Sequence, residues 1–358
     1  MDFKSPILPD GGKRTGKLAL MIGLSALALR MLALYLKPPV AEEIFTPLND
    51  PTDFDFLARM ILEGKYCAPN VQPSAFRPPL YPLFLAVIYA ICGQGNILAV
   101  AMTQVILGAI NAVLVMLTSR IITRNTAVAV TAGLAYALYP AYIFQTGNIL
   151  SEVLGRTLFL AGLLAFVSAI RKRKGSLLAW AGVLWALGIL NKPTFLASLP
   201  FAGIWLVIYG YGVAGMRIRT AVIAFLIPAA MTIAPWTARN WMASGRFIPV
   251  STNFPVTFAH GMTRYSYYAN YWYGPERLMD VPDNYQDLTQ LRFYGGVRHE
   301  LAVGDYFKKQ ALDFIRANPD FVVRLTFRRM LHFWSPFIRN APLERLAGLV
   351  SPCLPSSS

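Results

Sequence analysis

Long apolar segments alternate with short polar breaks along most of this chain. A membrane-spanning helix needs roughly 17 to 25 mostly apolar residues. Seven segments are candidate spans, and they lie near 17–36, 97–118, 127–145, 152–170, 177–191, 194–210 and 220–237. An eighth segment, Leu80–Cys92, has about thirteen residues, which is short for a span and predicts a helix that lies at the membrane interface or re-enters it. The pattern therefore predicts an all-α, polytopic membrane protein with about seven transmembrane helices.

The basic residues indicate how these segments cross the membrane, because cytoplasmic loops carry an excess of Lys and Arg. We place the N-terminus in the cytoplasm and treat Leu80–Cys92 as non-spanning. The loops predicted to be cytoplasmic then hold the basic clusters, which are Arg120–Arg124, Arg171–Lys174 and Arg217–Arg219. If Leu80–Cys92 spanned the membrane, every later loop would invert and the basic run at 171–174 would face outside. We therefore expect the short apolar helix not to span.

This topology divides the chain into two regions. Residues 1–238 form the predicted transmembrane domain, with a first outer loop at 37–96 that holds interfacial helices. Residues 239–358 form a small outer C-terminal region with fourteen Lys or Arg and nine Asp or Glu. Within it, the pattern of residues 304–334 predicts two helices broken at Pro319. Arginines among the aromatic residues of the second helix favour an interfacial position over a span.

Composition supports the membrane assignment and argues against nucleic-acid binding and against a zinc site. The chain is 55% hydrophobic and 14% charged, with a mean hydropathy of +0.45, whereas a soluble domain carries about 25% charged residues. Its net charge of +15 comes from short basic clusters between apolar segments, a pattern typical of membrane topology rather than of nucleic-acid binding. The three cysteines and three histidines show no metal-ligand spacing, so we expect no zinc site.

Carboxylates are scarce in the membrane part of the chain. Glu152 is the only acid between positions 64 and 275, whereas Asp50 and Asp53 belong to a group of three acids beyond the first span. The predicted topology places all of them at the outer face. Asp50 is the better candidate to act as a general base or to orient an acceptor hydroxyl or amine, because it precedes a predicted helix and can face a cavity. Glu152 is a functional candidate because ionisable groups inside a span usually serve function. Structural roles remain open too: Asp53 suits the first turn of a helix, and Glu152 can pair with Arg156 four residues later.

Three cations fall at the same outer face. Arg77 lies in a proline-rich segment that stiffens the entry to the short helix. Lys192 lies in a tight polar break between two spans, and Arg239 with Asn240 follows the last span. Cations in these places suit a phosphate. The alternatives are a snorkelling side chain for Arg77, a plain turn at Lys192, and a flanking charge at Arg239.

Several of these residues fall in five short motifs that occur in order. The motifs are Asp50 with Asp53-Phe54 and Leu57-Ala58-Arg59, the block Arg77 to Ala86, Leu150-Ser151-Glu152, Leu187 to Pro193, and Pro235-Trp236 with Arg239-Asn240. In these motifs and in their order, the chain resembles the bacterial GT-C membrane glycosyltransferases. These enzymes are related to dolichyl-phosphate-mannose–protein mannosyltransferases and the lipid A aminoarabinose transferase. Phe54 stands where that family usually has Tyr, and Ala186 where it usually has Gly. The match runs through about residue 255, with a weaker echo near 304–334.

The resemblance implies an inverting transfer of a sugar from a polyprenyl-phosphate donor. Asp50 is then the catalytic carboxylate, with Asp53 and Glu152 in support. The residues expected to hold the leaving lipid phosphate are Arg77, Lys192 and Arg239. Those expected to contact the substrate are Tyr81 and Asn240.

The sequence therefore predicts a mannosyltransferase-like enzyme of the inner (plasma) membrane, with its active site facing the periplasm or the outside. Its expected partners are a polyprenyl-phosphate-linked sugar, membrane lipids and an envelope acceptor that is a protein, a lipid or a glycan. No organic cofactor is expected. A divalent cation remains an alternative, because the carboxylate oxygens of Asp50, Asp53 and Glu152 are suitable ligands for one. A lipid-linked-sugar transporter or flippase and a non-catalytic subunit of an envelope complex are the alternatives.

Overall fold

The structure, a computed structural model, describes residues 11–44, 50–69, 72–172, 174–209, 218–261 and 295–333. These residues form α-helices joined by short loops and two 3-10 turns, and the described part of the chain has no strand beyond an isolated bridge between Cys67 and Pro73. The prediction of an all-α fold is confirmed for the described residues. The basic run at 171–174 and the cluster at 217–219 are described except for Arg173 and Arg217.

The helices fall into three groups along the chain. Those of the bundle are α1 (Gly11–Leu36), α5 (Ile97–Thr123), α6 (Thr126–Leu138), α7 (Pro140–Phe144), η1 (Gln145–Gly147), α8 (Glu152–Lys172), α9 (Gly175–Asn191), η2 (Pro193–Ala197), α10 (Ser198–Tyr209) and α11 (Ile218–Ser244). Those of the first outer loop are α2 (Ala41–Ile44), α3 (Asp50–Leu62) and α4 (Leu80–Cys92). Those of the C-terminal region are α12 (Phe254–His260), α15 (Gly296–Ala317) and α16 (Pro319–Phe333).

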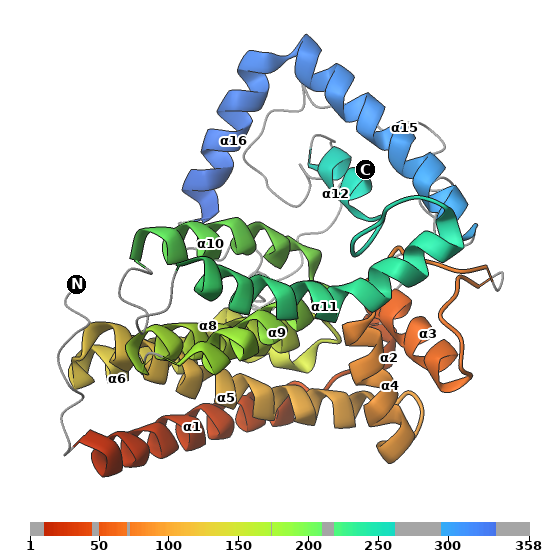
Figure 1. The fold of residues 1–358 in the computed structure, drawn as a ribbon. Helices are drawn as coiled ribbons and strands as arrows, with labels where there is room; N and C mark the ends of the chain where they lie inside the picture. Colours follow the sequence, from red (N-terminus) through yellow and green to blue (C-terminus); the bar gives the residue numbers. More distant parts are fainter. Residues whose placement is uncertain are drawn as a thin grey trace, which may run out of the picture.

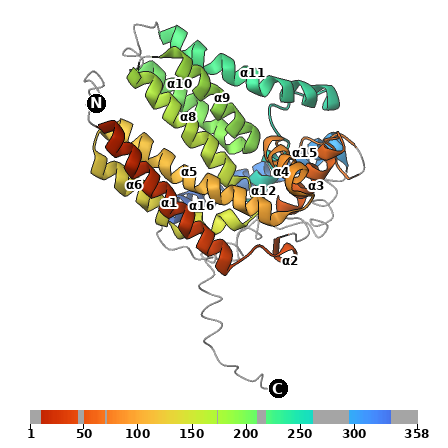
Figure 2. The ribbon, with the colours of Figure 1, turned by 90° about the horizontal axis from the view of Figure 1, so that it is seen from below.

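The bundle is a stack of roughly aligned helices (Figure 1). Helix α5 packs against α1, α6 and α8, and α9 packs between α8 and α11. Seen from below, α1 and α6 lie at one side of the stack and α11 at the other (Figure 2). Asparagine side chains begin two of the helices, because Asn96 accepts a hydrogen bond from Ala99 N and Asn125 accepts from Ala127 N and Val128 N.

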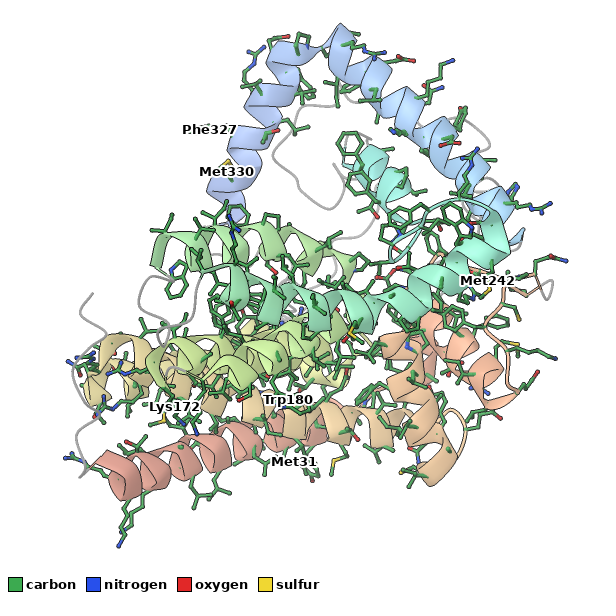
Figure 3. The ribbon with its side chains drawn as sticks, in the orientation of Figure 1. Met31, Lys172, Trp180, Met242, Phe327 and Met330 are labelled. Atoms are coloured by element: carbon green, nitrogen blue, oxygen red, sulfur yellow. The ribbon has the colours of Figure 1, made fainter. Side chains whose placement is uncertain are left out.

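Four helices are long and apolar enough to cross a membrane: α1, α5, α8 and α11. Helix α6 and the α7–η1 segment make a fifth candidate that is bent by 57° at a short break. The predicted spans near 177–191 and 194–210 form apolar helices shorter than a full span. Large apolar side chains face outward, including Met31, Trp180 and Met242 (Figure 3), as expected where lipid rather than water surrounds the bundle.

Helix α11 continues beyond the point where the sequence predicted the membrane part to stop. It runs through Pro228 and Pro235 to Ser244, so residue 238 lies inside the helix. A proline removes one backbone hydrogen bond and crowds the preceding turn, which favours a helix end but does not force one. The last two turns of α11 therefore carry Arg239 and Asn240 on a rigid element.

Helix α12 and the start of α15 lie at the end of the bundle where α3 and α4 are, whereas α16 lies toward the other end, above α10 (Figure 1). Residues 45–49 and 70–71 of the first outer loop, and 262–294 and 334–358 of the C-terminal region, lie outside the described residues. Helices α15 and α16 meet at Pro319, as predicted, and α15 packs on α12 through Val303 and Phe307. On α16, Val323 and Phe327 are exposed, and its interfacial position stays a prediction.

The contact between α9 and α11 depends on a glycine. A Cβ added to Gly182 would lie 2.2 Å from the backbone oxygen of Phe225, an overlap that only a backbone shift relieves. We expect Gly182→Ala to lower the free energy of unfolding by roughly 1–3 kcal/mol, measured as a loss of Tm in detergent. Gly203→Ala is the matched control, because Gly203 also lies in a helix and has no atom within 4 Å of an added Cβ. Equal Tm values for the two variants would contradict the close approach.

Candidate active site

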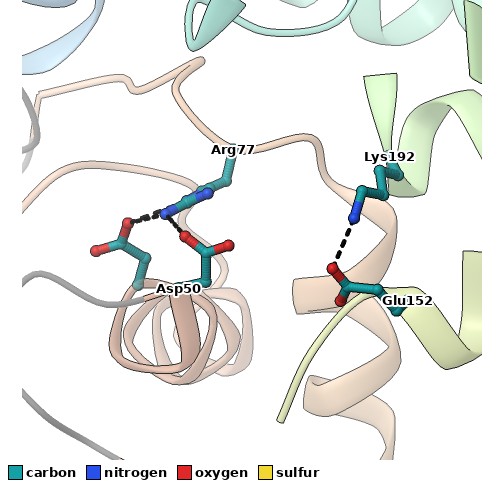
Figure 4. A network of polar contacts seen from close by, with 5 residues as sticks. Asp50, Arg77, Glu152 and Lys192 are labelled. Carbon is teal, nitrogen blue, oxygen red and sulfur yellow. Dashed lines mark hydrogen bonds and ion pairs between the residues drawn. The ribbon is translucent and has the colours of Figure 1, made fainter. Parts of the chain in front are cut away.

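Two carboxylates of α3 converge on one guanidinium. Asp50 begins the helix and Asp53 follows three residues later, so both side chains lie on the same face of the first turn. Arg77 donates from Nε and Nη2 to Asp53 Oδ2 at 3.0 and 2.8 Å, and from Nη2 to Asp50 Oδ1 at 2.5 Å. Figure 4 shows that Arg77 extends from its loop toward Asp50 at the N-terminal end of α3. The predicted candidates Asp50, Asp53 and Arg77 therefore form one cluster.

Burial separates the roles of these three groups. The side chain of Arg77 is 8% exposed and that of Asp53 13%, whereas that of Asp50 is 51% exposed. Burial alone lowers the pKa of Arg77, but the charges of Asp53 and Asp50 raise it above its ordinary value, so the guanidinium stays a cation. Asp50 is thus the carboxylate that can meet a ligand from solvent, and Asp53 is the one that holds Arg77.

The loop that carries Arg77 is fixed by tertiary contacts rather than by regular secondary structure. The hydroxyl of Tyr66 donates to Arg77 O at 2.8 Å, and burial raises the pKa of that hydroxyl, so it stays protonated as a donor. The guanidinium lies 5.2 Å from the ring centroid of Phe54 and 4.9 Å from that of Phe76. Pro78 and Pro79 then lead directly into α4. These contacts fix the position of the guanidinium above α3.

A second ion pair joins two helix ends. Glu152 begins α8, Lys192 follows the last residue of α9, and Lys192 Nζ lies 2.6 Å from Glu152 Oε1 (Figure 4). Asn191 Nδ2 also donates to Ser151 O at 2.7 Å and ties the same two ends together. The side chains of Lys192 and Glu152 are 34% and 26% exposed, so the pair is open to solvent on one side.

The sequence named a different partner for Glu152, and the structure corrects it. Arg156 donates to Gln145 Oε1 at 2.6 Å and lies 4.5 Å from the ring centroid of Tyr142. Glu152 uses Oε1 for Lys192, and its Oε2 is buried without a hydrogen bond within the described residues. The four-residue spacing therefore does not produce an ion pair here, because the first turn of α8 faces the end of α9.

Arg239 and Asn240, at the end of α11, bind protein groups. Arg239 donates to Ser74 O at 2.5 Å, to Tyr66 O at 2.6 Å and to Asn240 Oδ1 at 3.2 Å. Asn240 is fully buried and donates to Ile248 O at 3.2 Å. Both side chains thus hold the loops at this end of the bundle in place.

Tyr81 is also fully buried. Its hydroxyl donates to Gln104 Oε1 at 3.1 Å, and its ring packs edge-on against Phe54 at a centroid distance of 4.8 Å. Neither Tyr81 nor Asn240 is open to a substrate in this conformation.

The two ion pairs lie at the same end of the bundle. Phe54 and Tyr81 belong to one buried cluster with Ile149, which shortly precedes Glu152. A second buried cluster holds Leu190, two residues before Lys192. Trp236, three residues before Arg239, and Leu80 of α4 pack against this cluster. Helix α4 therefore lies between the carboxylates of α3 and the Glu152–Lys192 pair. The predicted candidates Asp50, Asp53, Arg77, Glu152 and Lys192 therefore lie at one end of the bundle.

Two carboxylates of this end were not among the candidate site residues of the sequence. Asp55 accepts hydrogen bonds from Arg59 Nε at 2.8 Å and from the hydroxyl of Tyr89 at 2.7 Å, so it fastens α3 to α4. Glu300 of α15 is buried against the loop that precedes Arg77. The only signal in the sequence was an acid in an amphipathic helix, which does not distinguish Glu300 from its neighbours. Within the described residues, no three His, Cys, Asp or Glu side chains converge as a metal site would require.

Comparison with known proteins places this geometry in a family context. The family model of dolichyl-phosphate-mannose-protein mannosyltransferases matches residues 76–243, just under half of the chain. The crystal structure of the apo oligosaccharyltransferase of Archaeoglobus fulgidus superposes with a TM-score of 0.51 at 14% identity. That alignment covers 96% of this chain and 40% of the archaeal chain, so the chain spans less than half the length of this relative. A search of curated proteins finds no significant match. The resemblance to the GT-C superfamily is confirmed, and the archaeal likeness concerns the fold alone.

Proposed function

We propose, on the premise that this chain is related to the GT-C membrane glycosyltransferases, that it transfers a sugar from a polyprenyl-phosphate donor to an envelope acceptor with inversion. A glycosyltransferase of this superfamily is what the family match and the fold support. The donor, the acceptor and an active site that faces the outside of the inner membrane are parts of the proposal. The observation that supports it most is Asp50, a half-exposed carboxylate held at the end of a helix by a buried arginine.

In the proposed reaction an acceptor hydroxyl or amine attacks the anomeric carbon of the donor. The bond between that carbon and the phosphate oxygen breaks, and the lipid phosphate leaves with the electron pair. Asp50 accepts the proton of the attacking group or orients it for attack. Because attack and departure occur on opposite sides of the carbon, the configuration inverts.

Negative charge develops on the phosphate as its bond to the sugar breaks. A cation placed beside the phosphate stabilises that charge. Of the three predicted cations, Lys192 fits this role best, because its side chain is one-third exposed and an ammonium has three donors. We assign Arg77 and Arg239 to holding the site, since their guanidinium groups bind carboxylates and backbone carbonyls. Glu152 then fixes Lys192 at the mouth of α8.

Envelope analysis of a deletion strain tests the proposal. We expect mass spectrometry to show that one sugar is missing from an envelope glycan, glycolipid or protein, and that its lipid-linked donor accumulates. The purified chain in nanodiscs should then restore the missing sugar from that donor, and assays with EDTA or with added Mn²⁺ decide the metal dependence. Movement of the lipid-linked sugar across liposomes without any transfer would instead support the transporter alternative.

A further inference from the structure

Glu300 is a buried carboxylate that the proposed reaction does not use. It lies in the second turn of α15 and is 2% exposed. It accepts three hydrogen bonds, from Ser74 Oγ at 2.5 Å, from Ala75 N at 3.1 Å and from Thr252 Oγ1 at 2.8 Å. Burial raises the pKa of this carboxyl, while the three hydrogen bonds and the charge of Arg239 act in the opposite direction. The carboxyl oxygens thus accept from one backbone amide and two hydroxyls, and burial outweighs these bonds and keeps the pKa of the carboxyl above its ordinary value.

The three donors join segments that are far apart in the chain. Ser74 and Ala75 precede Arg77, and Thr252 lies just before α12, so Glu300 reaches across 226 and 48 residues respectively. The side chain fastens α15 to the loop of the proposed active site and to the segment that follows α11. The family match ends at residue 243, so this connection lies outside the matched part of the chain.

Backbone groups of the loop before Arg77 also bind these neighbours. Val297 N, also of α15, donates to Pro73 O at 2.7 Å, and Thr252 N donates to Ala75 O at 3.0 Å. Phe76 N donates to Ser74 Oγ at 3.2 Å, so the serine hydroxyl that Glu300 orients also holds the residue next to Arg77. Buried backbone groups outside helices and sheets must find such partners. Glu300 therefore completes the set of bonds that determines where residues 74–77 lie.

We propose that Glu300 is a positioning residue for the sugar transfer: it fixes the loop so that Arg77 holds Asp50 in its reactive place. This inference rests on the proposed function. Glu300 acts through Ser74 and Ala75 and does not contact substrate. A displacement of about 1 Å in a reacting group costs roughly 10²-fold in rate, so a loose loop has a large effect without unfolding the protein.

Helix α15 has a second attachment that does not involve Glu300. Val303 and Phe307 are buried against Val256 and Ala259 of α12. Loss of Glu300 therefore leaves α15 attached, whereas Val303→Ala weakens the attachment without touching the Arg77 loop. Val303→Ala is the matched control for a purely structural effect.

Hydrogen–deuterium exchange of residues 73–79 in nanodiscs, followed by kinetics, tests the proposal. We expect Glu300→Ala to speed exchange in that loop by at least about tenfold and to lower kcat by roughly 10–100-fold, with KM for the donor changed much less. Glu300→Gln keeps an oxygen acceptor for Ala75 N and Thr252 Oγ1 and should restore most of both. Thr252→Val removes one of the three bonds and should give a smaller change in the same direction, which serves as the test if Glu300→Ala does not fold.

Two results would overturn the proposal. One is exchange in residues 73–79 that is the same in Glu300→Ala, or failing that in Thr252→Val, as in the wild type. The other is a loss of kcat that Val303→Ala reproduces at equal folded protein. If the wild type transfers no sugar, the proposed function fails, while the exchange measurements still decide whether Glu300 fixes the loop.

Discussion

Replacing Asp50 with asparagine is expected to lower the rate of sugar transfer by about 10²–10⁴-fold, the usual contribution of a general base. Asparagine keeps the size of the side chain and its ability to bind Arg77, but it cannot accept a proton from the acceptor. Because Asp50 is half exposed and Arg77 retains Asp53, the loss of one ion pair costs only about 0–1 kcal/mol of stability. The measurement is kcat with the donor identified from the deletion strain, together with Tm.

Asp55→Asn is the control for this variant. It removes the same charge from the same helix, and the asparagine oxygen still accepts from the hydroxyl of Tyr89. We expect Asp55→Asn to keep activity close to that of the wild type. An active Asp50→Asn enzyme would show that Asp50 is not the catalytic carboxylate, and an equal loss in both variants would indicate that the charge of α3 matters rather than one reacting group.

The sequence was informative about which residues gather and much less about which of them pair. The run of apolar segments and basic loops placed Asp50, Arg77 and Glu152 at one end of a helical bundle, and the structure places them there. Hydropathy and charge are properties of whole segments, so they survive uncertainty about side-chain direction. Pairing depends on rotation of each helix by a fraction of a turn, and the pattern of residues does not fix that rotation.

Glu152 and Pro235 show this limit in physical terms. The spacing of Glu152 and Arg156 permits an ion pair, but the end of α9 brings Lys192 to 2.6 Å and takes that place. Local spacing is worth only about 0.2–0.5 kcal/mol, so tertiary contacts override it. The sequence ended the last span near residue 237, two residues after Pro235, whereas α11 continues to Ser244. The hydrogen bonds of Glu300 could not be predicted from the sequence, because its partners lie in distant segments that only the fold brings together.

Loss of Arg77 is expected to have the largest effect on stability. Arg77→Met keeps much of the side-chain volume but removes the buried guanidinium that pairs with Asp53, whose side chain is 13% exposed; breaking a buried pair costs about 3–5 kcal/mol. Arg59→Met is the matched control, because Arg59 also pairs with an aspartate of α3 but is 39% exposed, so we expect a loss of at most about 1 kcal/mol. The measurement is thermal unfolding in the same detergent for both variants.

A double variant separates the ion pair from the packing of Arg77. Arg77→Met combined with Asp53→Asn removes both charges, and we expect it to recover more than half of the stability lost in Arg77→Met, since no buried charge is left uncompensated. The same variants decide between the two roles that Arg77 can take at this site. If Arg77 held the donor phosphate, Arg77→Met would raise KM for the donor and leave the Tm near that of Arg59→Met. A large loss of Tm that Asp53→Asn relieves is the result expected of an arginine whose main partners are the carboxylates of α3.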